Sequence, residues 1–180
     1  MAENVFIHYG SYCYDPARYV PVRNCSWKPK PEDGTGLWAS RENLVHEDGW
    51  MNYGWKEWCE DSGYRTFSLK RSFRFRLRNG SKSIILKEPA DLLPLPKTNP
   101  WSLKQDQDMF LFEKGQRPTM EQMQEYFKPN PCYLDYEKLR DEFAVDAIEL
   151  QHSMSFRRCL DTWDCDCIVI LNPEIIEVVI

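Results

Sequence analysis

Three side chains on separate apolar segments of this chain have the types that bind and activate a ligand. His8 lies in an apolar run near the N-terminus, Trp38 follows a glycine-rich turn, and Glu149 lies between Ile148 and Leu150. An imidazole offers hydrogen-bonding nitrogens, an indole offers a stacking face, and a carboxylate stabilises developing positive charge. If three strands bring these groups together, we expect a site for a flat ring joined to a sugar, with the chemistry at the bond between them.

Each of these residues also has a simpler structural interpretation. His8 and Trp38 lie in apolar surroundings, where a ring is more often part of the core. Glu149 is harder to explain in this way, because side chains alternate along a strand and Ile148 and Leu150 must point to the opposite face. A buried carboxylate without a partner is costly, so we expect Glu149 to face either solvent or a cleft.

The elements that position these residues are mainly strands. Apolar runs and alternating patterns predict strands at 4–9, 37–40, 71–77, 83–86, 147–150, 168–171 and 175–180. Asn79-Gly80 is a strong hairpin signal, and it predicts that 83–86 returns beside 71–77.

Helices are expected between the strands, and the segment 47–59, which holds three tryptophans, is predicted to be a mixed loop and short helix. Helical spacing predicts two further helices at 118–127 and 135–143, and the second is expected to bury Tyr136, Leu139 and Phe143. The order of strands and helices predicts an α+β fold with a largely antiparallel sheet system.

Length, charge and cysteine content limit the class of protein. A chain of 180 residues is predicted to form a single domain over residues 1–180. The net charge of -5 argues against a general nucleic-acid binder, which needs a basic face to neutralise phosphates. We find no apolar run long enough for a membrane helix and no signal-peptide pattern, and the seven cysteines favour reduced thiols in the cytoplasm. Cys165 and Cys167 lack the usual zinc-ligand spacing, so no metal site is expected.

Short motifs in a fixed order resemble one known family. They are His8-Tyr9-Gly10-Ser11, Gly36-Leu37-Trp38-Ala39-Ser40, Ile148-Glu149 and a closing strand before Asn172-Pro173. Their order resembles the ADP-ribosyltransferase family, and more narrowly its branch with a histidine, an aromatic residue and a glutamate, as in diphtheria-type toxins and poly-ADP-ribose polymerases. The resemblance covers most of the chain and implies a split β-sandwich whose cleft holds NAD. It also implies an NAD-dependent ADP-ribosyltransferase, which cleaves the nicotinamide–ribose bond and transfers ADP-ribose to an acceptor.

The resemblance implies binding roles for the first motif. His8 would hydrogen-bond the adenosine-side ribose, and the Gly10 backbone would contact the carboxamide of nicotinamide. Tyr9 and Ser11 belong to the same NAD-binding segment. The family's commonest motif has histidine directly before glycine, whereas Tyr9 intervenes here, as in a minority branch.

For the other motifs the resemblance implies stacking and catalysis. Trp38 stands where a tyrosine usually stacks on nicotinamide, so the stacking face is kept and the phenol is lost. Ser40 matches a hydroxyl often present there, and Glu149 matches the catalytic glutamate. Breaking this bond passes through an oxocarbenium-like state, whose positive charge a nearby carboxylate stabilises. The implied catalytic residue is Glu149, while His8 acts by positioning the ligand.

Two other functions stay open on the same scaffold. An RNA 2′-phosphotransferase would hold a phosphate with arginines, and a non-catalytic module would bind a nucleotide or a partner protein through exposed aromatic residues. The arginines of the basic segment are Arg71, Arg74, Arg76 and Arg78. The clustered tryptophans are Trp50, Trp55 and Trp58. The simpler interpretations are a solvated strand face for the arginines and a roof over the core for the tryptophans. The acceptor of ADP-ribose stays open among protein, nucleic acid, a small molecule and water.

Overall fold

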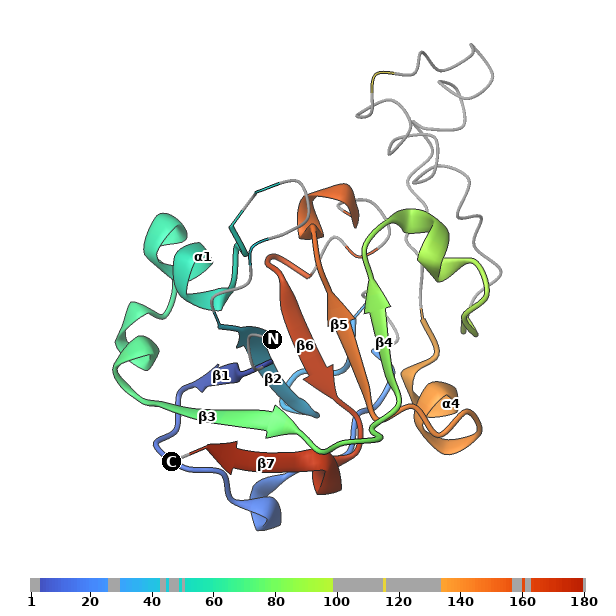
Figure 1. Cartoon of the computed structure of the whole chain (residues 1–180), viewed down its shortest axis with the longest axis horizontal. Helices are drawn as coiled ribbons and strands as arrows, with labels where there is room; N and C mark the ends of the chain where they lie inside the picture. Colours follow the sequence, from blue (N-terminus) through green and yellow to red (C-terminus); the bar gives the residue numbers. More distant parts are fainter. Residues whose placement is uncertain are drawn as a thin grey trace.

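The computed structural model describes residues 4–25, 30–42, 45, 49, 51–98, 115, 134–156, 160 and 163–179. In these residues, seven strands form one mixed sheet, accompanied by two short α-helices (Figure 1). The strands are β1 Phe6–Tyr9, β2 Leu37–Arg41, β3 Ser72–Leu77, β4 Ser83–Leu86, β5 Ala147–Leu150, β6 Cys167–Ile170 and β7 Ile176–Val179. The helices are α1 Trp55–Ser62 and α4 Tyr136–Asp141. The predicted α+β class with mostly antiparallel strands is confirmed.

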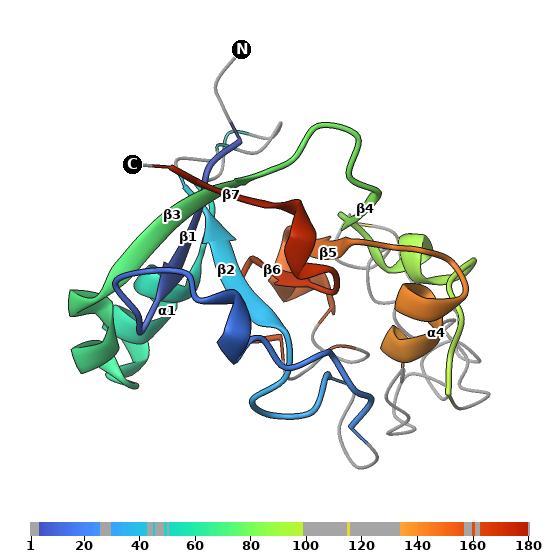
Figure 2. The ribbon, with the colours of Figure 1, turned by 90° about the horizontal axis from the view of Figure 1, so that it is seen from below.

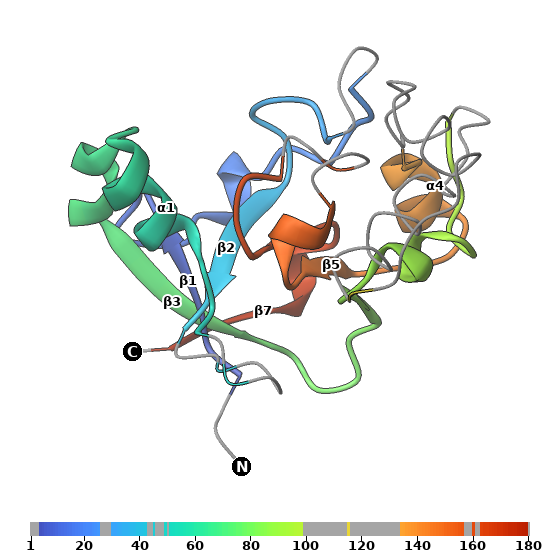
Figure 3. The same ribbon diagram turned by 90° about the horizontal axis from the view of Figure 1, so that it is seen from above.

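The sheet changes direction between its two halves. The strand order is β4-β5-β6-β2-β1-β3-β7, and only β4 and β5 run parallel to each other. Figure 1 shows β4, β5 and β6 running in one direction and β3 and β7 crossing it, so β2 and β1 lie where the sheet turns. Figures 2 and 3 show α1 beside the half that contains β1 and β3, and α4 at the opposite end of the sheet.

Buried apolar side chains cover both faces of the sheet. Strand alternation sends Ile148, Leu150 and Val169 to one face, where they join the larger cluster of buried residues. Ala147 and Ile168 point to the other face and join a second cluster. Because both faces are covered, every residue of β5 and β6 is buried, which explains the continuous apolar sequence of β6 and means that Glu149 of β5 is buried as well.

The predicted hairpin between β3 and β4 is wrong. The turn forms at Asn79-Gly80, but β3 pairs with β1 and β7, whereas β4 pairs with β5. After the turn, the Lys82 N–H donates to the Asp146 carboxylate at 2.7 Å, and the Lys82 ammonium donates to the Phe143 carbonyl at 2.6 Å. These long-range contacts direct β4 to β5, where Leu86 is fully buried.

The helix predicted at 135–143 is present but shorter. α4 begins after Asp135, whose carboxylate caps its first turn, and it buries Tyr136 and Leu139. Phe143 lies beyond the end of α4 and is 45% exposed, so the expectation that it is buried is wrong. The helix predicted at 118–127 lies outside the described residues. In the described part of the chain, no helix has the length and apolar character needed to cross a membrane.

Candidate functional site

β1 and β2 pair over only two positions and then separate. The paired residues of β1 are Phe6 and Ile7, whereas β1 stays paired with β3 as far as Tyr9. Where the ladder with β2 ends, Nδ1 of His8 donates to the backbone carbonyl of Trp38 at 2.7 Å. We call this place, where the two strands part, the fork. The structure therefore brings the His8 ring to the backbone of Trp38 at the fork.

The hydrogen bond at the fork defines the state of the His8 ring. A carbonyl oxygen can only accept, so Nδ1 carries the proton and Nε2 is an acceptor in the neutral ring. Burial lowers the pKa of His8 below its ordinary value of 6.5, and the bond to the Trp38 carbonyl partly opposes this shift. Burial also raises the pKa of the neighbouring Tyr9 phenol, and the charge of Glu57 adds to this effect. Two neutral polar groups, Nε2 and the phenol, therefore stand beside the fork at neutral pH.

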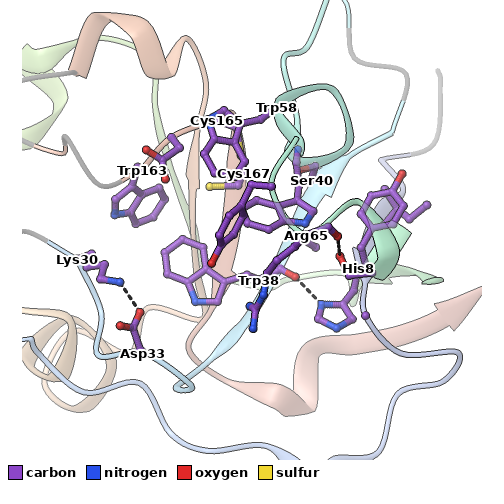
Figure 4. Close-up of a pocket in the computed structure, with 18 of the residues that line it drawn as sticks. His8, Lys30, Asp33, Trp38, Ser40, Trp58, Arg65, Trp163, Cys165 and Cys167 are labelled. Carbon is purple, nitrogen blue, oxygen red and sulfur yellow. Dashed lines mark hydrogen bonds and ion pairs between the residues drawn. The ribbon is translucent and has the colours of Figure 1, made fainter. Parts of the chain in front are cut away.

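A pocket of about 560 Å³ opens at the fork. Its walls come from β1, β2, α1, the segment that precedes β6, and the 3₁₀ helix η2 Thr66–Lys70 that follows α1. Figure 4 shows Trp38 between Trp163 on one side and His8 on the other. The predicted residues that line the pocket are His8, Tyr9, Gly10, Trp38 and Ser40. Its volume lies within the range of about 300–1,000 Å³ that is typical of small-molecule sites.

Aromatic rings form much of the pocket wall. Trp38 meets Trp163 edge to face, with ring centroids 4.9 Å apart. Trp55 and Trp58 of α1 stack with centroids 5.0 Å apart, and Tyr64 meets Trp58 edge-on at 5.4 Å. The indole rings also pack against the larger core cluster, so two of the clustered tryptophans line the pocket and cover the core at once. Rings held in this way suit a flat aromatic ligand.

The remaining residues of the two binding motifs also have structural contacts. Ser40 is buried, and its hydroxyl accepts from the Trp55 N–H at 2.8 Å, which holds the first turn of α1 against β2. Gly10 has a φ of 112°, a conformation that glycine adopts readily, and it turns the chain out of β1. Ser11 lies outside the pocket lining and donates to the Cys13 carbonyl at 2.8 Å.

Glu149 does not line the pocket. In the register it is aligned with Ile168 of β6, which is aligned with Ala39 of β2. Side chains that are aligned across neighbouring strands point to the same face of the sheet, so Glu149 shares a face with Ala39. Side chains alternate along a strand, so Trp38, the neighbour of Ala39, points to the opposite face. Because Glu149 is not among the residues that line the pocket of His8 and Trp38, its catalytic role stays a prediction that the geometry does not favour.

A buried ion pair explains the presence of Glu149 in a core strand. Nε of Arg41 lies 2.7 Å from Oε1 of Glu149, and the Gln151 amide donates to the same carboxylate at 2.9 Å. Glu149 is 3% exposed. The expectation that it faces solvent or a cleft is therefore wrong, because Arg41 provides the partner that a buried carboxylate requires.

Other carboxylates line the pocket instead. Glu32 and Asp33 each form an ion pair with a basic side chain, and the pair between Asp33 and Lys30 is drawn in Figure 4. Asp164 is exposed and lies directly after Trp163, in the segment that leads into β6. The motifs do not include Asp164, and the only signal for it was its place before the strand predicted at 168–171.

Two arginines line the pocket from the ends of η2. Arg65 precedes η2 and Arg71 follows it, and neither forms an ion pair with a residue in the described part of the chain. On β3 and just after it, Arg74 and Arg78 instead pair with glutamates at 2.8 Å and 3.6 Å. Arg74 and Arg78 are also exposed, as a solvated strand face requires, while the first arginine of the segment lines the pocket.

Cys167, which lines the pocket, is not an activated thiol. The hydrogen bond with Cys165 raises the pKa of Cys167 well above its ordinary value, and burial raises it further. A thiol in this state is a poor nucleophile. Among the residues with described positions, no three His, Cys, Asp or Glu side chains form a group that could hold a metal ion.

Comparison with known proteins finds no matching family model, no matching curated protein and no matching solved structure. The function is therefore inferred from the geometry of the pocket and from the short motifs that border it.

Proposed function

We propose that this chain is an NAD-dependent ADP-ribosyltransferase whose pocket at the fork binds NAD and cleaves its nicotinamide–ribose bond. The observation that carries this proposal is the meeting of His8 and Trp38, 30 positions apart in the sequence, inside a ring-lined pocket. A sheet that divides between β1 and β2 is compatible with the split β-sandwich that the motifs imply.

Binding would use groups that are already in place. Trp38, backed by Trp163, offers a ring for stacking against nicotinamide. Nε2 of His8 would accept a hydrogen bond from a ribose hydroxyl, because Nδ1 is already committed to the Trp38 carbonyl. Gly10 lines the same pocket and has no side chain to keep a ligand away from its backbone.

Cleavage needs a carboxylate beside the sugar. The electron pair of the bond between C1′ and the ring nitrogen leaves with nicotinamide, and positive charge develops on the ribose. We assign the stabilising carboxylate to Asp164, which follows Trp163 and shares the pocket with Trp38. Water or another acceptor hydroxyl then forms a bond to C1′ and gives its proton to the carboxylate or to solvent. With water, the products are nicotinamide, ADP-ribose and a proton.

The direct test is to measure nicotinamide release from NAD by the purified chain, with NAD affinity measured separately by calorimetry. We expect both binding and release. Trp38→Ala should weaken NAD binding by about 10-fold or more, because stacking a base on an aromatic ring is worth about 1–3 kcal/mol. Phe143→Ala, at an exposed ring that does not line the pocket, is the control. A chain that does not bind NAD would overturn the proposal.

A nucleotide-binding module without catalysis is the second candidate, and the position of Glu149 outside the pocket favours it. It shares NAD binding with the first proposal but requires that no nicotinamide is released. The structure gives less support to the phosphotransferase alternative, because Arg74 and Arg78, which would hold the phosphate, already form ion pairs. Nicotinamide release that depends on added 2′-phosphorylated RNA would favour that alternative.

A further inference from the structure

Most of the arginines in the described part of the chain are already neutralised. Of the nine arginines there, six form ion pairs with carboxylates: Arg18, Arg23, Arg41, Arg74, Arg78 and Arg140. Arg65 and Arg71 form no such pair with a described residue, and both line the pocket. Two guanidinium groups without a carboxylate partner, at a pocket walled by rings, indicate a ligand that carries an anionic group.

The backbone holds both arginines at the same rim. Arg65 has a φ of 48° and a ψ of 28°, a left-handed conformation that is unfavourable for a residue with a side chain. Its guanidinium lies 5.8 Å from the centroid of the Tyr64 ring, which is itself part of the pocket wall. At the other end of η2, the Arg71 carbonyl accepts from the Gly10 N–H at 2.7 Å. This bond ties the end of η2 to the exit of β1, and Figure 4 shows Arg65 in the same pocket as His8 and Trp38.

We propose that Arg65 and Arg71 form a subsite that binds the diphosphate of a nucleotide whose rings occupy the aromatic part of the pocket. The rise of a 3₁₀ helix places the two backbone positions about 12 Å apart, which two long side chains can span from either side of a diphosphate. Arginine suits this role because its N–H groups bind phosphate oxygens in pairs and its charge persists at any physiological pH. The subsite rests on the proposed function for the identity of its ligand, since NAD carries a diphosphate between two ring-bearing halves.

Calorimetry with ADP and adenosine isolates the subsite, because these ligands differ only in the diphosphate. We expect ADP to bind at least about 10-fold more tightly than adenosine, by a margin that decreases as salt increases. Arg71→Gln and Arg65→Gly should each weaken ADP binding by about 10-fold and leave adenosine binding unchanged. Arg65→Gly also relieves the left-handed backbone, so its melting temperature should not fall and the lost affinity cannot come from unfolding. Arg78→Gln, at an ion-paired arginine outside the pocket, is the matched control.

In calorimetry, three results would overturn the subsite: no ADP binding, equal affinity for ADP and adenosine, or ADP binding that both variants leave unchanged. Failure of the proposed function gives a different result, in which ADP binds through both arginines while NAD yields no nicotinamide. If nicotinamide release continues with an unchanged KM in both variants, the subsite is wrong and the proposed function stands.

Discussion

The two faces of β2 use polar residues in different ways. On one face, Trp38 and Ser40 border a pocket that is open to a ligand. On the other face, Arg41 pairs with the buried Glu149, and neither residue lines the pocket. Ser40 and Arg41 are neighbours in the sequence, but strand alternation separates their side chains. Residue type alone therefore does not distinguish a binding group from a structural one; the face of the sheet does.

Breaking the ion pair on the closed face should have the largest effect. Glu149→Ala leaves the buried Arg41 guanidinium without its carboxylate, and we expect the free energy of unfolding to fall by about 3–5 kcal/mol. Urea denaturation measures this loss. Glu177→Ala breaks an exposed pair and should cost less than about 1 kcal/mol. The motifs instead predict that Glu149 is catalytic, so that its substitution removes activity and leaves stability unchanged. A Glu149→Gln variant that is fully stable and inactive would therefore contradict the structural role.

On the pocket face, removing the charge of Asp164 should affect catalysis rather than folding. We expect Asp164→Asn to lower the rate of nicotinamide release by about 100-fold, or about 3 kcal/mol, with little change in NAD affinity. The measurements are single-turnover kinetics and calorimetry. Asp33→Asn, at an ion-paired carboxylate of the same pocket, is the control. Full activity in Asp164→Asn would remove this residue from the mechanism.

Ser40 tests whether a residue on the pocket face can have a mainly structural role. Its hydroxyl accepts from the first N–H of α1, so we expect Ser40→Ala to lower the free energy of unfolding by about 1 kcal/mol. Chemical denaturation measures this change. Ser11→Ala, at a residue outside the pocket, should change stability by less than about 0.5 kcal/mol and should not affect NAD binding. If Ser40→Ala loses more free energy of NAD binding than of unfolding, the Ser40 hydroxyl instead contacts the ligand.

The smallest expected effect is the pH dependence that His8 contributes. Burial lowers the pKa of His8 in the folded state, whereas its pKa in the unfolded chain is 6.5. As the pH falls through 6.5, the unfolded chain therefore takes up a proton before the folded chain does. The contribution of His8 to stability is therefore complete above 6.5 and declines as the pH falls towards the folded pKa. When denaturation is measured between about pH 8 and pH 5.5, the free energy of unfolding should decline less steeply with falling pH in His8→Gln than in the natural chain. Identical slopes would show that the His8 ring is not desolvated.

Local pattern predicted the strands of the sheet. The seven strands lie within one or two residues of the predicted ranges, because alternating and continuous apolar runs report burial directly. The glycine-rich turn before Trp38 was also informative, since Gly36 has a φ of 68° and a side chain there would come within 2.6 Å of Val22. The strand positions and the backbone conformation of this turn depend on residues close in the sequence.

Features that depend on distant residues could not be predicted in the same way. Asn79-Gly80 forms its turn, but the partners of β3 and β4 were decided by contacts with other strands. Arg65 belongs to no strand pattern, and its place at the pocket rim follows from how η2 packs beside β1. Asp164 likewise reaches the pocket only because β6 pairs with β2.

By itself, the sequence determined the class of the fold and the position of each strand, because these follow from backbone preferences and short-range burial patterns. The tertiary structure alone decided which carboxylate lies at the pocket. Glu149 lies inside β5 and Asp164 lies just before β6, and pairing of β5 with β6, and of β6 with β2, places one against Arg41 and the other at the pocket. Register between strands far apart in the chain sets the face of each side chain, and no local pattern carries that information.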